Sequence, residues 1–190
     1  MAAQELLWKV LTDAWVLGEI AVAIFTYTRR SKGEVQDRGT QALLWVVIFG
    51  SFWIGGWMHG KFPFDMPGRH AVLVPLAIAL ILVGLAIRAT AIFSLGRAFS
   101  ANVAVRTTQT LNRSGLYRFV RHPSYLGLEI ILLAAALHSR TWVCFAIEFI
   151  PPTLALLYRI HVEEAALRRA FGAAYDDYAR TTRRLIPGLY

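Results

Sequence analysis

The stretch AVLVPLAIALILVGLAIRATAIF, residues 71–93, contains a single charged residue, Arg88. A hydrocarbon core about 30 Å thick requires roughly 20 apolar residues in a helix, because lipid offers no partner to an unpaired backbone group. This stretch is therefore long enough to cross a bilayer. A mean hydropathy of +0.47 and 56% hydrophobic residues place the whole chain in the same class, so the sequence predicts a membrane protein.

Four further apolar stretches flank this segment. They are residues 10–28, 42–58, 125–137 and 142–158. Only His138, Ser139 and Arg140 separate the last two stretches, and the first of that pair is short for a span, so we expect a tight helical hairpin there. The predicted fold is an all-α membrane protein with five transmembrane helices, the last two forming the hairpin.

Lysine and arginine residues determine the predicted orientation, because they are retained on the cytoplasmic side during insertion. With the N-terminus outside and the C-terminus in the cytoplasm, 15 of the 20 lie inside. These are Arg29, Arg30, Lys32, Arg38, Arg97, Arg106, Arg113, Arg118, Arg121, Arg159, Arg168, Arg169, Arg180, Arg183 and Arg184. Outside remain Lys9, Lys61, Arg69 and Arg140, and Arg88 lies within the third span. We predict an integral protein of a bacterial-type inner membrane.

The formal net charge of +8 does not indicate a nucleic-acid partner, because the basic residues lie between apolar runs and not on one face. The expected partners are membrane lipids. Cys144 is the only cysteine, so the sequence offers no intrachain disulfide or multi-cysteine metal site. No group of His, Cys and carboxylate residues has metal-ligand spacing, and no metal is expected.

The segment Arg121-His122-Pro123-Ser124-Tyr125-Leu126-Gly127 stands where a cytoplasmic loop, residues 94–121, turns into the fourth span. Pro123 suits the first helical turn, where a missing N–H costs least, and the other N–H groups of that turn can bind an anionic group. His122 and Tyr125 are expected to face one cytoplasmic pocket. An interfacial anchor is the alternative interpretation, because these residue types are common at membrane boundaries.

A second polar cluster, Arg159, Glu163 and Glu164, stands where the last span leaves the membrane. Arg159 and Glu163 are four positions apart and share a helix face, whereas Glu164 points about 100° away. An intrahelical ion pair would explain the first two, but charges at a bilayer boundary beside another polar cluster are candidates for function. Residues 161–181 are predicted to follow as a cytoplasmic amphipathic helix, interrupted by Gly172.

Glu19, Arg88 and Glu148 lie inside the apolar stretches, where an unpaired charge is costly. Glu19 and Glu148 are expected to face the interior of the bundle. Structural pairing with Arg88 explains them as well as contact with a substrate would.

The polar motifs form an ordered set along the second half of the chain. The set comprises GLYRFVRHPSYLG at residues 115–127, Arg159-x3-Glu163-Glu164, Phe171-Gly172-x2-Tyr175-x2-Tyr178 and Arg184-x2-Pro187. This combination, which covers roughly residues 95–187, resembles the isoprenylcysteine carboxyl methyltransferase family. The fragment His-Pro-x-Tyr-x-Gly alone is less specific, because similar fragments occur in membrane sterol reductases and, more loosely, in phospholipid methyltransferases.

The resemblance implies S-adenosylmethionine as the cofactor, bound between the loop before the fourth span and the cytoplasmic tail. It assigns Glu163 to the methionine part of the cofactor and Arg159 to an acceptor carboxylate, and these are the predicted catalytic residues. The other predicted cofactor contacts are Gln109, Thr110, Leu111, Asn112, Tyr117, His122, Pro123, Ser124 and Tyr125. Gln109 stands where the family usually has a histidine. The implied organisation is a three-span N-terminal membrane region, residues 1–93, and a catalytic region, residues 94–190, that holds the cofactor loop, the hairpin and the tail.

Methyl transfer from a sulfonium to a carboxylate needs no strong general base, because the carboxylate is already ionised at neutral pH. Positioning the two reactants in line supplies much of the rate, and Arg159 is suited to a two-point contact with the acceptor's oxygens. The expected acceptor is a lipophilic acid, such as a thioether-linked isoprenoid cysteine analogue. We expect it to reach the site sideways, between the third and fourth spans.

Two other functions fit parts of the sequence. An NADPH-dependent reductase of membrane lipids would share the His-Pro-x-Tyr fragment and would use Arg106, Arg113 or Arg118 for the 2'-phosphate. A small transporter or assembly protein would use the charged clusters only as helix anchors, although the sequence lacks the two related halves typical of transporters.

Overall fold

The computed structural model describes residues 2–26, 34–35, 39–62, 65–66, 70–96, 104–105, 111–188 and 190. Within these residues the chain is helical apart from one short antiparallel ladder. The helices are α1 (Ala2–Thr26), α2 (Thr40–Met58), α3 (His70–Leu95), η3 (Gly115–Arg118), α4 (Pro123–His138), α5 (Trp142–Phe171) and α6 (Ala173–Thr181). The ladder pairs β1 (Glu34–Val35) with β2 (Ala104–Val105).

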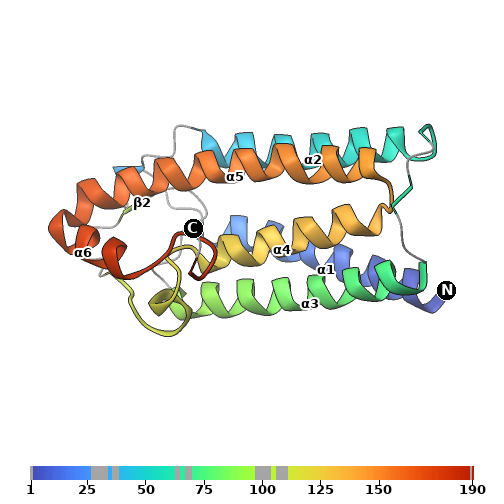
Figure 1. Ribbon diagram of the computed structural model, residues 1–190. Coiled ribbons are helices and arrows are strands. Elements are labelled where there is room, and N and C mark those ends of the chain that lie inside the picture. The colour runs from blue at the N-terminus through green and yellow to red at the C-terminus, as the bar shows by residue number, and fades with distance from the viewer. Residues whose placement is uncertain are drawn as a thin grey trace.

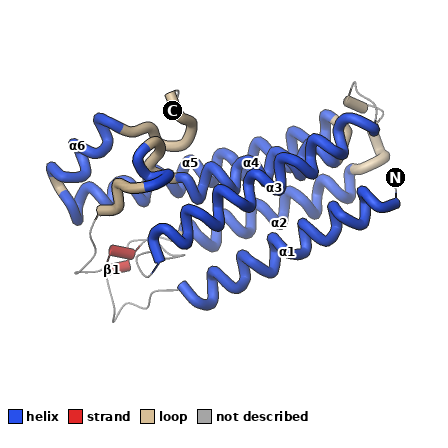
Figure 2. Tube along the Cα trace, turned by 90° about the horizontal axis from the view of Figure 1, so that it is seen from below, coloured by secondary structure: helices blue, strands red, loops and turns tan. Residues whose placement is uncertain are grey.

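Five long helices lie side by side, and each runs opposite to the one before it in sequence (Figure 1). Helices α2 and α5 form one layer, α3 lies on the other side of α4, and α1 crosses behind α4 in the view of Figure 1. The N-terminus and the C-terminal segment with α6 lie at opposite ends of the bundle, as Figure 2 also shows. The core consists mainly of aliphatic residues from α2 to α5, including Ile48, Ile81, Leu128, Leu132 and Leu156, together with Trp15 of α1 and Leu185 of the tail.

The predicted stretches 42–58, 71–93, 125–137 and 142–158 fall within α2 to α5. Residues 10–26 of the first predicted stretch fall within α1, and residues 27–28 lie outside the described residues. In the part of the chain that the structure describes, three helical segments have the length and apolarity of a membrane span, namely Thr40–Met58, Ala71–Leu95 and Trp142–Phe171, and α4 is a shorter apolar helix. Many large apolar side chains face outward, and Trp53 and Phe93 are 77% and 82% exposed. Such a surface suits lipid and not water, so the chain is an integral membrane protein.

The turn between α4 and α5 lies where the sequence predicts it. Helix α4 ends at His138, Arg140 adopts a φ of 61°, and α5 begins after Thr141. The Thr141 hydroxyl caps α5 by accepting a hydrogen bond from the Cys144 N–H at 3.2 Å. The hairpin therefore closes within three residues.

The predicted boundary between the last span and the tail helix is wrong. Helix α5 continues without a break to Phe171, because no glycine or proline follows its apolar part before Gly172. Gly172 has a φ of 53° and separates α5 from α6. Arg159, Glu163 and Glu164 consequently stand on the same rigid helix as the apolar segment.

Two glycines allow α3 and α4 to pack with their backbones in contact. A Cβ atom on Gly127 would lie 2.7 Å from the Gly84 carbonyl oxygen and 2.8 Å from the backbone nitrogen of Arg88. A Cβ atom on Gly84 would likewise lie 2.7 Å from the Gly127 carbonyl oxygen. The expectation that an acceptor passes between the third and fourth spans is therefore wrong, because these two helices are closed against each other.

Replacing Gly127 by alanine is expected to destabilise the bundle by about 1–3 kcal/mol, the range for overpacking a tight interior. The added methyl group meets backbone atoms of α3, which have no rotamer to change. Thermal unfolding of the detergent-purified protein measures the effect.

Gly50→Ala is the matched control, because a Cβ atom at Gly50 meets nothing within 4 Å. That variant should be as stable as the wild type or slightly more stable, since alanine favours a helix. Equal stability of the Gly127→Ala and Gly50→Ala proteins would contradict the close packing of α3 on α4.

Candidate functional site

The residues before α4 are held in place by the C-terminal tail. The Arg121 N–H donates to the Arg183 carbonyl at 2.7 Å, and the His122 N–H donates to the Arg184 carbonyl at 3.0 Å. His122 is the N-cap residue of α4, and Pro123 occupies the first turn as predicted. This pairing brings the tail motif against the His-Pro-Ser-Tyr segment, although about 60 residues separate them in sequence.

Tyr125 links the two residues predicted to be catalytic. Its hydroxyl donates to Glu163 Oε2 at 2.7 Å and accepts from Arg159 Nε at 2.9 Å. Arg159 is only 3% exposed, and its Nη1 donates to the Thr40 hydroxyl at 3.0 Å. The structure therefore brings Arg159, Glu163 and Tyr125 together and adds Thr40, from the start of α2, which the sequence did not suggest.

Glu164 is the most heavily paired acidic residue of this end of the bundle. Its carboxylate, 1% exposed, lies 2.8 Å from Arg121 Nε and 3.0 Å from Arg184 Nε. His122 Nε2 lies 3.5 Å away, and Arg168 lies 3.7 Å away. Sequence reasoning assigned no role to Glu164. The sequence did hold one indication of its role. In a helix, Glu164 points about 100° away from Glu163, and so it faces different neighbours, which are the loop and the tail.

Ser124 belongs to a buried ion-pair network. Arg88 Nη1 donates to both the hydroxyl and the carbonyl oxygen of Ser124, each at 3.0 Å. The same guanidinium forms an ion pair with Glu19, to which Nη2 donates at 2.5 Å. The predicted pairing of Glu19 with Arg88 is confirmed. Through it, α1 and α3 are fastened to the first turn of α4.

Tyr117 lies beneath the loop and faces α3. Its hydroxyl donates to the Ala91 carbonyl at 3.3 Å, and its own carbonyl accepts from the Tyr178 hydroxyl at 2.6 Å. Burial raises the pKa of Tyr117 well above its usual range and that of Tyr178 to about 12. Both hydroxyls are protonated at neutral pH and act as donors that join η3 to α3 and α6.

The predicted cofactor contacts at residues 109–112 are described only in part. Gln109 and Thr110 lie outside the described residues, whereas Leu111 is half-buried. Asn112 forms a local turn, in which its Oδ1 accepts from the Ser114 N–H at 3.0 Å.

A small cavity of about 40 Å³ adjoins the Arg159 cluster. It is lined from α1 to α5 by Glu19, Gln41, Trp45, Arg88, Tyr125 and Arg159, among others. Two guanidinium groups against one carboxylate give its walls a net positive charge, which suits an anionic group. Among the residues that the structure describes, no group of three His, Cys, Asp or Glu residues could hold a metal ion.

Comparison with known proteins relates this arrangement to a family. Residues 77–169 match the sequence model of the isoprenylcysteine carboxyl methyltransferase family. A probable protein-S-isoprenylcysteine O-methyltransferase of Oryza sativa subsp. indica is 29% identical over 118 residues, which are 59% of this chain and 60% of the relative. Methanethiol S-methyltransferase 2 of Bradyrhizobium diazoefficiens is 34% identical over 103 residues, which are 52% of this chain and 38% of the relative.

The fold is also similar to that of a solved structure. The eukaryotic intramembrane Ras methyltransferase superposes on 80% of this chain and 53% of its own, with a TM-score of 0.58 and 21% sequence identity. The chain thus spans between about two fifths and three fifths of the length of these proteins.

Glu164→Gln is expected to lower the free energy of unfolding by about 3 kcal/mol or more, because it leaves the buried Arg121 without its counter-charge. Glu163→Gln is the control on the next residue. It should cost at most about 1 kcal/mol, since glutamine can still accept the bond from Tyr125. Thermal unfolding of both proteins in detergent distinguishes them, and equal losses would show that Glu164 does not hold the loop and the tail together.

Proposed function

We propose that this chain, whose residues 77–169 belong to the isoprenylcysteine carboxyl methyltransferase family, transfers a methyl group from S-adenosylmethionine to the carboxylate of a lipophilic, membrane-dissolved acceptor. The observation that carries the proposal is the Arg159–Tyr125–Glu163 chain at the end of an apolar bundle. It places one cation and one carboxylate on adjacent turns of α5, joined by a hydroxyl that orients both.

The residues around Glu163 fit the methionine end of the cofactor. A half-buried carboxylate that already accepts one hydrogen bond has acceptor capacity left for an ammonium group. Tyr125 fixes the rotamer of Glu163, so the carboxylate is pre-oriented. His122, Pro123, Ser124 and Tyr117 support the loop at this place, and we infer that the segment of Gln109, Thr110, Leu111 and Asn112 covers the cofactor.

Arg159 is proposed to bind the acceptor. A buried guanidinium offers a planar fork that matches a carboxylate, and it is oriented by Tyr125 and Thr40 from two different helices. The name of the Bradyrhizobium relative refers to a thiol acceptor, methanethiol. A thiol would gain less from this guanidinium than a carboxylate does, so the carboxylate is favoured here. A phospholipid amine would be repelled by it.

The route of the acceptor is proposed to run between α1 and α2. The interface of α3 with α4 is closed by Gly84 and Gly127, whereas the small cavity beside Arg159 is lined by α1 and α2. An acceptor with an apolar body would enter from the bilayer and place its anionic end between Arg88 and Arg159.

For this reaction the protein has to hold the two reactants in line and to bind their charged groups. When bound, S-adenosylmethionine supplies a methyl carbon activated by positive sulfur, and its transfer forms an O–C bond as the S–C bond breaks. Arg159 holds the acceptor oxygens and Glu163 holds the cofactor, so the two sites lie one turn apart on a single helix. The bundle excludes water around Arg159, which strengthens both charged contacts.

The family match and the names of both relatives support methyl transfer over the NADPH-dependent reductase, and over a transporter or assembly protein without catalysis. We also propose the division into a membrane region, residues 1–93, and a catalytic region, residues 94–190. Thr40 and Arg88 are contributions of the first region to the proposed site.

The proposed topology has five spans, with the N-terminus outside and the site in the cytoplasm of a bacterial-type inner membrane. The alternating helix directions place the two termini at opposite ends of the bundle (Figure 1). A reporter fused after Tyr190 should then be cytoplasmic and a tag before Met1 external. Two cytoplasmic termini would contradict five spans.

Arg159→Lys is expected to reduce methyl transfer by about 100-fold or more, because lysine keeps the charge but loses the planar two-point fork. The affinity for S-adenosylhomocysteine should change little. Transfer from labelled S-adenosylmethionine to an isoprenylated cysteine analogue measures the first quantity, and calorimetry measures the second.

Glu163→Gln should give the reverse pattern, with cofactor affinity weaker by about 1–3 kcal/mol and folding retained. If Arg159→Lys lost cofactor affinity in step with activity, Arg159 would belong to the cofactor site. A wild-type protein that methylates only amine head groups would assign the chain to phospholipid methylation.

A further inference from the structure

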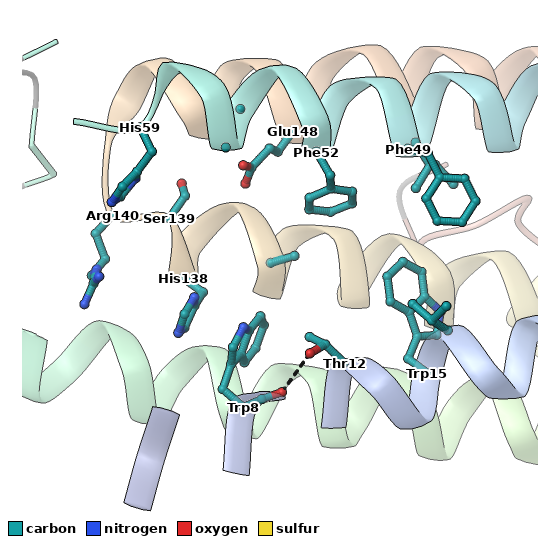
Figure 3. Close-up of a pocket in the computed structure, with 15 residues that line it drawn as sticks. Trp8, Thr12, Trp15, Phe49, Phe52, His59, His138, Ser139, Arg140 and Glu148 are labelled. Carbon is teal, nitrogen blue, oxygen red and sulfur yellow. Dashed lines mark hydrogen bonds between the residues drawn. The ribbon is translucent and has the colours of Figure 1, made fainter. Parts of the chain in front are cut away.

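A second, larger cavity lies at the other end of the bundle from Arg159. Its volume is about 430 Å³, within the range of sites for small molecules. Figure 3 shows it between the layer of α2 and α5 on one side and α1 with α4 on the other. Its wall is aromatic, formed mainly by Trp8, Trp15, Phe49 and Phe52.

Glu148 is the acidic residue of this wall. It stands on α5, is 6% exposed, and directs its carboxylate into the space beside Phe52 (Figure 3). In the described part of the chain, no hydrogen bond or ion pair joins this carboxylate to another residue. Gly55 makes room for it, because a Cβ atom there would lie 2.3 Å from Glu148 Oε1. The packing thus accommodates a carboxylate without supplying its partner.

The basic side chains near the mouth of the cavity, His138 and Arg140, have another acidic partner. His138 Nε2 lies 3.2 Å from Glu5 Oε2, and Arg140 Nη1 lies 3.8 Å from Glu5 Oε1. His138 also stacks on Trp8, with ring centroids 4.2 Å apart. Glu5, on α1, is therefore the acidic partner of His138 and Arg140 at the mouth of the cavity, while Glu148 faces the aromatic side chains inside it.

We propose that this cavity binds an amphiphile with an alkylammonium group, which forms an ion pair with Glu148 while its apolar body lies along α1 and α2. A buried carboxylate is costly unless it is paired, and aromatic faces attract an organic cation. The wall from Trp8 to Trp15 extends about 10 Å along α1, at 1.5 Å per residue. Since Glu148 lies only about 9 Å from the start of α5, the ammonium group reaches it from the membrane boundary past His59 and Arg140.

This site is independent of the proposed methyl transfer. The two cavities share no lining residue, and the Trp15 indole of the larger one donates to Glu19 of the smaller one at 3.2 Å. Two sources would supply the same chemistry, a free lipophilic amine or the head group of an aminophospholipid.

The test titrates the full-length protein in dodecyl maltoside with dodecylamine, 1-dodecanol and dodecanoate, and follows tryptophan fluorescence and the unfolding temperature. Dodecylamine should bind saturably and about tenfold or more tightly than the alcohol or the acid, as expected for a charge-assisted contact. Glu148→Gln should abolish this preference. Glu129→Gln is the matched control, because Glu129 is a half-buried carboxylate that accepts from Thr153 at 2.6 Å and does not line the cavity.

Equal affinity of wild type for the amine and the alcohol would overturn the proposal, as would a preference that survives in Glu148→Gln. The wild-type comparison decides the question even if that variant fails to fold. Phosphatidylethanolamine in phosphatidylglycerol nanodiscs identifies the source. Displacement of dodecylamine by this lipid assigns the site to a head group, and its failure to displace assigns the site to a free amine.

Discussion

The carboxylate of Glu164 holds together three segments that are distant in sequence. It is buried on α5, and it meets Arg121 from the loop before α4 and Arg184 from the tail after α6. A charge removed from water is tolerated only when counter-charges and hydrogen bonds surround it, so this cluster forms as a unit or not at all. Backbone pairing of residues 119–122 with the tail reinforces the same junction.

The position of Tyr125 depends on that junction. The loop before α4 determines where the helix begins, and Tyr125, in its first turn, then meets Arg159 and Glu163 on α5. Two consecutive glutamates thereby serve different purposes. Glu164 faces Arg121 and Arg184, whereas Glu163 faces Tyr125, because consecutive residues of a helix point about 100° apart. The contacts of Tyr125 with Arg159 and Glu163 join two helices, and helices hold side chains more precisely than loops do.

The charged residues inside the bundle differ in whether they have a partner in the protein. Glu19 and Arg88 neutralise each other and tie α1 and α3 to Ser124 at the start of α4. Glu148 occupies a comparable apolar setting but faces an aromatic cavity. Close glycine packing seals α3 against α4, whereas the cavity of about 430 Å³ lies along α1 and α2. Small residues and paired charges together decide where the bundle is closed.

The sequence by itself determined the helical membrane class, the positions of five helices and the hairpin turn, because apolar run length and turn residues are local properties. Family motifs also predicted that Arg159, Glu163 and Tyr125 belong to one site, and the structure brings the three side chains together. Only the tertiary structure revealed that Tyr125 joins the other two, that Thr40 contributes from α2, and that Glu164 binds the loop to the tail. These contacts join residues 20 to 119 positions apart, and no local pattern specifies which face of one helix meets which face of another.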